Sequence, residues 1–220
     1  MTAMQFACVL FPNLTQLDLT GPYEVFHRLP DAVVQLVAAT PDPVESEGGL
    51  AIVPTATFSE LGFSDVLFVP GGTGVNEAML DEELIAFLKR QGDHARWVTS
   101  ACTGALLLGA AGLLAGYEAA THWASMEFLQ SFGAWPKAER VVVSANRITG
   151  GGVSAGIDIA LRIAEETHGR RVAEEIRLAI EYRPEDPSAD DVRRAVLAQL
   201  APMKERRRRA VEEAARKSSS

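Results

Sequence analysis

The sequence predicts an α/β fold in which helices cover both faces of a parallel β-sheet. Apolar segments of strand length alternate with segments of helical character along most of the 220 residues. One such strand, residues 65–69 (DVLFV), is apolar without alternation, which is typical of a strand buried on both faces. Successive parallel strands are then joined by right-handed crossovers. We therefore predict one α/β body, residues 1–183, followed by a helical tail, residues 184–220.

The composition restricts the class of protein. Hydrophobic residues make up 47% of the chain, as in a globular protein, and the formal net charge of -8 argues against nucleic-acid binding over the whole body. The two cysteines, Cys8 and Cys102, each lie in an apolar stretch, which predicts no disulfide framework and fits a reducing compartment. The chain starts directly into a strand, and no apolar run reaches membrane-spanning length. The sequence therefore predicts a soluble cytoplasmic protein with no membrane partner.

A buried strand and a helix open the chain. Residues 5–11 (QFACVLF) predict the strand, in which Cys8 serves as a small hydrophobic side chain. The helix is predicted to begin at Thr20, a good N-cap residue with Pro22 in the first turn and Glu24 close behind. Further strands are predicted over residues 32–40, 51–53, 65–69, 96–100, 118–121, 140–143 and 147–149, and further helices over residues 81–95, 104–114, 123–132, 154–168, 170–182 and 188–216.

Asp18 lies just before the predicted first helix, between Leu17 and Leu19. A carboxylate at such a strand-to-helix junction is either a turn-former or a group held in a pocket. The local residues alone favour the turn-former.

A glycine-rich loop, residues 70–74 (PGGTG), follows the strand at residues 65–69. It lacks the Lys-Ser/Thr of a phosphate-binding P-loop and the glycine spacing of a dinucleotide site. We interpret it as backbone that approaches a ligand closely and offers N–H groups to it.

Cys102 lies at the turn between a predicted strand, residues 96–100, and a predicted helix, residues 104–114, which Gly116 ends. A strand that turns into a helix within about two residues forms a tight elbow like the one that displays the nucleophilic serine of α/β-hydrolases. Amides and the dipole at the helix N-terminus favour a thiolate there. Cys102 is therefore interpreted as a nucleophile, in preference to an inert buried thiol.

Three of these turns are predicted to meet. Asp18, the pair Gly71–Gly72 and Cys102 each follow a strand of the predicted sheet. Sites in parallel α/β sheets lie at the carboxyl ends of the strands. The sequence thus predicts one site built from these three turns.

Five short motifs carry a family resemblance: LDLTGP at 17–22, PGG at 70–72, SACTG at 100–104, THW at 121–123 and TGGG at 149–152. Together they resemble the DJ-1/PfpI superfamily, and within it most closely the isocyanide hydratase branch. The resemblance implies a flavodoxin-like, class I glutaminase-like three-layer α/β/α sandwich with a mostly parallel sheet over residues 1–183. It also implies a homodimer that uses no metal and no organic cofactor.

The resemblance assigns the nucleophile to Cys102 and its acidic partner to Asp18. The Cys102 thiolate would add to an isocyanide carbon, Asp18 or a water that it orders would deliver the proton, and hydrolysis of the thioimidate would release an N-substituted formamide. Backbone N–H groups near Gly72 and Thr103 are expected to position the thiolate, water or substrate nitrogen. The Thr103 hydroxyl is expected either to hold the water or to cap the helix. The protease-like branch has histidine at the position of Thr103, so Cys-His chemistry is disfavoured.

Other candidate residues receive structural interpretations. His122 is predicted to make a hydrogen bond at a helix start, in preference to acid–base work. The histidines, cysteines and acidic residues show no metal-ligand spacing, which predicts no metal site. Residues 150–152 (GGG) are predicted to let the following helix approach Cys102 closely.

The tail is predicted to be a helix that Pro202 kinks or divides. Its basic run at 204–209 (KERRRR) is interpreted as a solvated helix face with acidic neighbours, in preference to a nucleic-acid site. An apolar stripe is predicted to pack on the chain's own body or on a partner subunit, and the terminal serines are predicted to be disordered. The stripe consists of Val192, Val196, Leu197 and Leu200, and the serines are Ser218, Ser219 and Ser220.

Two alternatives to the hydratase remain. One is a glyoxalase- or amidase-like member of the same superfamily, which Thr103 disfavours. The other is a non-catalytic sensor of a ligand or of oxidation at Cys102, because similar motifs occur in sensor domains of AraC-type regulators. The tail is too short for the two helix-turn-helix units that such regulators append.

Overall fold

A seven-stranded sheet forms the centre of the protein. The structure is a computed structural model that describes residues 3–183 and 190–218, with side chains described over 3–183 and 201–217. The strands lie in the order β10-β11-β7-β6-β1-β2-β5, and every adjacent pair is parallel except β10–β11. Their bounds are β1 (Met4–Val9), β2 (Ala32–Ala38), β5 (Ala56–Thr57), β6 (Val66–Val69), β7 (Trp97–Ser100), β10 (Val141–Ser144) and β11 (Arg147–Gly150). The predicted, mostly parallel α/β fold is confirmed.

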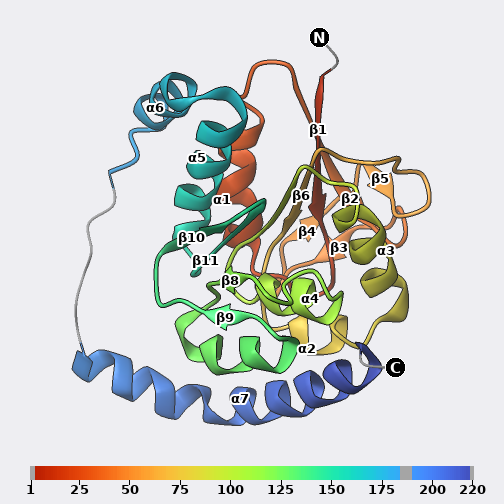
Figure 1. The fold of residues 1–220 in the computed structure, drawn as a ribbon, viewed down its shortest axis with the longest axis vertical. Helices are drawn as coiled ribbons and strands as arrows, with labels where there is room; N and C mark the ends of the chain where they lie inside the picture. The colour runs from red at the N-terminus through yellow and green to blue at the C-terminus, as the bar shows by residue number, and fades with distance from the viewer. Residues whose placement is uncertain (1–2, 184–189, 219–220) are drawn as a thin grey trace.

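Helices cover both faces of this sheet (Figure 1). The helices α1 (Gln16–Phe26) and α5 (Ala155–His168) pack together on one face, with α6 (Arg170–Ala179) against α5. On the other face, α3 (Glu82–Gly92) packs against α4 (Gly104–Ala110). The remaining elements are α2 (Val75–Ala78), the 3-10 helix η1 (Trp123–Phe132), α7 (Asp190–Ser218), and two small sheets, β3 (Val44–Glu45) with β4 (Ala51–Ile52) and β8 (Glu118–Ala119) with β9 (Trp135–Pro136).

The core lies between the central strands and their helices. All four residues of β6 are buried, as its continuous apolar sequence predicts. The Phe26 ring of α1 lies 5.0 Å from that of Phe6 on β1 and 5.4 Å from that of Phe68 on β6, measured between ring centroids. Burying each such side chain contributes about 1.5–3 kcal/mol, so these contacts fix α1 against the middle of the sheet.

The first helix begins earlier than predicted. It starts at Gln16, with Thr15 in extended conformation at the N-cap, so the prediction of a start at Thr20 is wrong. Pro22 therefore lies inside the helix, where Gly156 of α5 packs against its ring. Tertiary packing of α1 on α5 outweighs the local preference of proline for a first turn. As a result, Asp18 lies in the first turn of α1 and not before it.

Other element boundaries also differ from the sequence prediction. The helix after Cys102 ends at Ala110, because Gly112 adopts a left-handed φ of 74° well before Gly116. The predicted helix at 123–132 is a 3-10 helix. In the tail, Pro202 lies inside a single helix, α7, and does not divide it.

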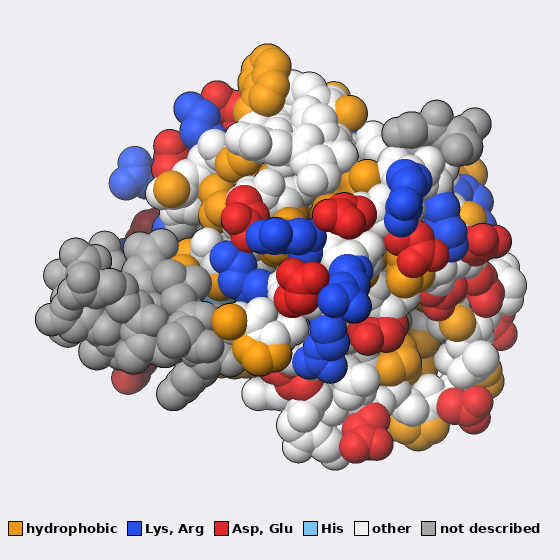
Figure 2. All heavy atoms as spheres, turned by 90° about the horizontal axis from the view of Figure 1, so that it is seen from below, with side chains coloured by type: hydrophobic (Ala, Val, Ile, Leu, Met, Phe, Trp, Pro, Cys, Tyr) orange, Lys and Arg blue, Asp and Glu red, His pale blue; other side chains and the backbone are white. Residues whose placement is uncertain are grey.

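The tail helix α7 runs across the edge of the body at which the parallel strands end, below α2 and α4 (Figure 1). It packs against η1, α2 and α4 of the same chain. Its outer face carries interleaved basic and acidic side chains (Figure 2), with ion pairs between Arg209 and Glu205 and between Lys217 and Glu213. Most of the basic run is thus solvated, as predicted. The predicted apolar stripe (Val192, Val196, Leu197, Leu200) lies outside the described side chains, as does Ser218, and Ser219 and Ser220 lie outside the described residues.

None of the helices described, over residues 3–183 and 190–218, is both long and apolar enough to span a membrane.

Candidate active site

The predicted turns meet where the central strands end. Strand β1 lies between β2 and β6. The connection from β1 leads to β2 on one side of it, whereas the connection from β6 leads to β7 on the other side, so the direction of the chain switches at this point of the sheet. The segment after β1 leads to Asp18, the segment after β6 contains Gly71 and Gly72, and the segment after β7 contains Cys102. A Cβ atom on Gly71 would lie 2.8 Å from Cys102 Cβ, so the β6 loop touches the elbow directly. The predicted convergence is confirmed.

Cys102 occupies a constrained elbow. Its φ of 54° lies in the left-handed region, which costs a non-glycine residue on the order of 1–2 kcal/mol. The backbone N–H of Cys102 donates to the carbonyl oxygens of Gly150 and Gly151, at 3.1 and 3.0 Å. A Cβ atom on Gly152 would lie only 2.4 Å from Cys102 Sγ. The close approach to the thiol is thus made by the glycine run itself, and α5 begins only at Ala155.

Asp18 is fully buried in the first turn of α1. Burial raises the pKa of its carboxyl from 3.8 to about 7, and contacts with the Cys102 thiol and the Gly71 amide only partly offset this. Neither carboxyl oxygen meets hydrogen-bond geometry with any group in the described part of the chain. A buried carboxyl in this environment carries a proton near neutral pH. The turn-former interpretation of Asp18 is wrong.

The thiol of Cys102 is also less acidic than the sequence predicts. Burial and the negative charge of Asp18 raise its pKa well above the usual value, whereas the Thr103 amide and the Arg207 guanidinium lower it. The prediction that the helix N-terminus favours a thiolate omitted burial, which is the largest effect. Because the charge on either acid opposes ionisation of the other, the thiol and the carboxyl titrate as a coupled pair.

Thr103 binds the β6 loop. Its hydroxyl accepts a hydrogen bond from the Gly72 N–H at 3.0 Å and donates to the Gly72 carbonyl at 3.2 Å. In the described residues this hydroxyl makes no capping bond to α4, so that interpretation is wrong. The Gly72 N–H is engaged by Thr103 and is not free for a ligand, contrary to the prediction. The Thr103 N–H remains as the backbone donor to Cys102 Sγ.

A pocket of about 380 Å³ opens beside Cys102. Its lining comes from the segment before α1, the β3–β4 loop, the β6 loop, the elbow, the start of η1, the segment before α5, and α7. The lining residues include Glu47, Gly72, Cys102, Thr103, His122, Met203 and Arg207. Asp18 has no exposed surface and contacts the thiol from within the protein.

His122 is a structural residue of this pocket. Its Nδ1 accepts a hydrogen bond from the Ala124 N–H at 3.3 Å, which confirms the predicted bond at a helix start. Burial, together with the charge of Arg207, lowers its pKa, so the imidazole is neutral at physiological pH.

The sequence did not indicate that α7 reaches the site. Arg207 lies in a run predicted to be solvated, yet it is 3% exposed and lines the pocket beside Met203. Arg207 differs from its neighbours Arg206 and Arg208 only in that it projects from a different side of the helix. The sequence of a basic run does not reveal which side chain faces the protein, because that depends on how the helix packs against the body.

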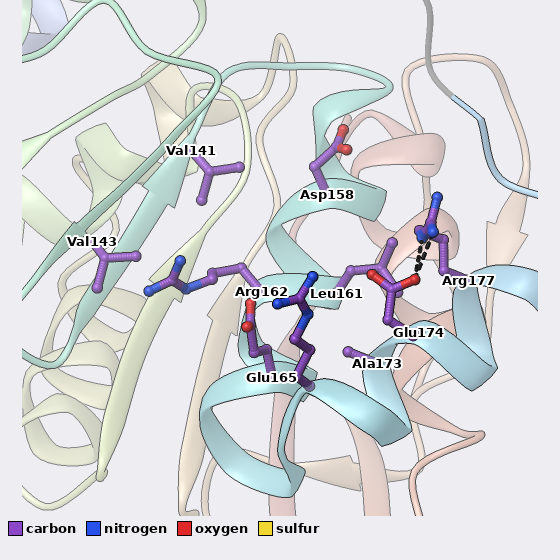
Figure 3. Close-up of a pocket in the computed structure, with 10 residues that line it drawn as sticks. Val141, Val143, Asp158, Leu161, Arg162, Glu165, Ala173, Glu174 and Arg177 are labelled. Atoms are coloured by element: carbon purple, nitrogen blue, oxygen red, sulfur yellow. Dashed lines mark hydrogen bonds and ion pairs between the residues drawn. The ribbon is translucent and has the colours of Figure 1, made fainter.

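A second hollow, of about 420 Å³, lies between β10, α5 and α6 (Figure 3). Its wall combines the apolar side chains of Val141 and Leu161 with charged side chains, among which Arg177 donates to Glu174. It contains none of the predicted site residues. Within the described chain, no three histidine, cysteine or acidic side chains are grouped so as to bind a metal ion.

Comparison with known proteins identifies close relatives. Residues 4–166 match the model of the DJ-1/PfpI family. The chain is 49% identical over 185 residues to the isonitrile hydratase of Pseudomonas putida, a match that covers 84% of this chain and 81% of that protein. The structure of a THiJ/PfpI family protein from Pseudomonas syringae superposes with a TM-score of 0.91 at 41% identity, covering 96% of this chain and 91% of that one.

A transcriptional regulator shares part of the same fold. The HTH-type transcriptional regulator GbdR of Pseudomonas aeruginosa is 31% identical over 134 residues, which cover 59% of this chain and 36% of the regulator.

Proposed function

The chain belongs to the DJ-1/PfpI family, and from this we propose that it is an isocyanide hydratase, a cysteine-dependent lyase that converts an isocyanide and water to an N-substituted formamide. The 49% identity to an isonitrile hydratase supports this activity. The main structural support for this activity is the Asp18 carboxyl, which is buried next to the Cys102 thiol and has a pKa of about 7. An isocyanide carbon must accept both a nucleophile and a proton, and this pair can supply both.

In the first step, the Cys102 sulfur attacks the terminal carbon of the isocyanide. The sulfur–carbon bond forms, and the proton held by the pair is delivered to the same carbon, with Asp18 as the donor. The product is a thioimidate, in which the former isocyanide carbon is bonded to sulfur, hydrogen and nitrogen. The Thr103 N–H stabilises the thiolate before the attack.

In the second step, water adds to the thioimidate carbon. The ionised Asp18 accepts one proton of the water, the nitrogen gains the other, and the carbon–sulfur bond breaks to release the Cys102 thiolate. The formamide leaves, and Cys102 and Asp18 regain their resting state with one shared proton. The Thr103 hydroxyl acts indirectly, by holding the Gly72 loop against the elbow.

A ligand- or oxidation-sensing role is the second candidate, because a transcriptional regulator shares 31% identity with this chain. An oxidation sensor would react with peroxide at Cys102 and release no formamide. A ligand sensor would bind an isocyanide in the pocket and release no formamide.

The protein acts on a small molecule as a homodimer in the cytoplasm and binds no nucleic acid. The net charge of -8 supports the last point. Light scattering after size-exclusion chromatography would measure a dimer mass, and a monomer mass would contradict it.

Steady-state turnover of one aliphatic and one aromatic isocyanide tests the hydratase. We expect the wild type to release formamide, Cys102→Ala to release none, and Asp18→Asn to be strongly impaired. Cys8→Ala is the matched control, because Cys8 is a buried cysteine of β1 outside the pocket. A folded wild type that turns over no isocyanide overturns the proposal, and assays with α-oxoaldehydes then test the glyoxalase-like alternative.

A further inference from the structure

Arg207 differs from the rest of the basic run on α7. The side chains of Arg206, Arg208 and Arg209 are exposed, whereas Arg207 is buried and points from α7 into the pocket that contains Cys102. A helix remote in sequence from the elbow therefore supplies a cation to the reaction site. Burying a guanidinium costs free energy unless hydrogen bonds or an opposite charge compensate for its lost hydration.

The guanidinium is held by three neutral acceptors. Its Nε donates to Asn76 Oδ1 of α2 at 3.1 Å, and its Nη1 donates to Ser125 Oγ of η1 at 2.8 Å. Its Nη2 lies 3.4 Å from the Gly72 carbonyl oxygen. Three separate elements thus fix the planar group, a geometry that a lysine ammonium does not reproduce.

The charge of Arg207 is not neutralised by a direct partner. Among the described residues, no carboxylate forms an ion pair with it. The charged and titratable groups that influence it are the Cys102 thiol and, more weakly, Glu47 and Glu77. His122, which shares the pocket, is neutral, and Asp18 carries a proton near neutral pH. Glu47 and Glu77 act on the guanidinium without forming an ion pair, and a thiolate that forms at Cys102 meets its positive charge in the same pocket.

We propose that Arg207 is a positioning residue of the isocyanide hydratase reaction, which holds the Gly72 loop against Thr103 and places a fixed positive charge in the pocket where the thiolate forms. This inference rests on the proposed function. Arg207 donates to the same Gly72 carbonyl that the Thr103 hydroxyl donates to, so the guanidinium supports the contact that sets the elbow. The tail helix is therefore part of the active site.

Variants of Arg207 distinguish the effect of its positive charge from the effect of its hydrogen-bond geometry. Arg207→Gln removes the charge, Arg207→Lys keeps the charge and loses the planar donor set, and exposed Arg208→Gln is the matched control. Two readouts are taken: the pH profile of Cys102 alkylation by iodoacetamide, and kcat and KM for isocyanide hydration. Alkylation does not depend on which substrate the protein uses.

For Arg207→Gln we expect the alkylation midpoint to rise by about one pH unit, because the thiolate loses a nearby cation. We expect kcat to fall at least about tenfold with a smaller change in KM. Arg207→Lys is expected to keep an alkylation midpoint near that of wild type but to lose kcat. Arg208→Gln should match wild type in both.

Wild-type alkylation and wild-type kcat in folded Arg207→Gln would overturn the inference. Should that variant fail to fold, Ser125→Ala is measured in its place, because it removes the hydrogen-bond acceptor of Arg207 Nη1. A wild-type kcat in Ser125→Ala overturns the inference. Absence of isocyanide turnover by the wild type instead overturns the proposed function, and the alkylation profile then still reports whether Arg207 acts on the thiol.

Discussion

The carboxyl of Asp18 and the thiol of Cys102 contact each other in the interior of the protein, and a charge on either raises the free energy of ionising the other. Burial acts on both groups in the same direction. The pair therefore holds a proton near neutral pH that an exposed carboxylate would have lost. This coupling gives the site an acid and a nucleophile without a histidine.

The proton on Asp18 predicts the pH dependence of catalysis. In the proposed mechanism the Asp18–Cys102 pair reacts with one proton, and the first of its two protons leaves near the raised pKa of about 7. We therefore expect kcat/KM to rise as pH increases through about 7. Asp18→Asn should lower kcat by about 100-fold or more and remove this rise. Formamide release measured from pH 5 to 9 checks both, and an unchanged rise in the variant would assign the titration to another group.

The same carboxyl predicts how stability depends on pH. The folded-state pKa of about 7 exceeds the ordinary value of 3.8, so its contribution is fully present below pH 3.8 and is lost as pH rises through 7. A shift of this size corresponds to about 4 kcal/mol at most. Urea unfolding from pH 5 to 8 should show this loss in wild type, whereas Asp18→Asn should show a flatter profile. Equal slopes in the two proteins would contradict the raised pKa.

Gly152 predicts a steric effect on the nucleophile. Gly152→Ala would bring a Cβ atom to 2.4 Å from Cys102 Sγ and must displace the thiol or the segment that precedes α5. We expect a loss of about 1–3 kcal/mol in unfolding free energy and near-complete loss of turnover. Gly48→Ala is the control, because nothing lies within 4 Å of the added Cβ. Full activity of Gly152→Ala would exclude the close approach.

The Thr103 hydroxyl is expected to support both activity and stability, so Thr103→Val should lose them and Thr103→Ser should keep them. Thr103→Val removes the hydroxyl that bonds to both the N–H and the carbonyl of Gly72. The carbonyl keeps its contacts with Arg207 and the Val75 N–H, but the buried Gly72 N–H is left unpaired at a cost of about 1–3 kcal/mol. Thr103→Ser keeps the hydroxyl and should restore most of kcat and of the unfolding midpoint. Parallel kinetics and thermal unfolding of the two variants measure this difference. If valine and serine behave alike, the hydroxyl is not what holds the loop.

Much of the architecture followed from local sequence. Apolar runs of strand length and segments of helical character gave the alternating elements, because burial on a sheet face or helix stripe requires such patterns. The parallel connections then brought Asp18, Gly71–Gly72 and Cys102 to one edge of the sheet. The elbow at Cys102 and the glycines at 150–152 were also readable, since tight turns and close approaches restrict residue type locally.

The chemistry of the site depended on contacts between remote segments. The pKa of Asp18 is set by its burial and by contact with Cys102. The Thr103 hydroxyl pairs with Gly72 instead of its own helix, and Arg207 faces inward from the tail helix α7. Sequence patterns report which face of a segment is apolar, because that depends on near neighbours. They do not report which buried polar group meets which partner, because desolvation and hydrogen bonding are determined only once the segments are packed together.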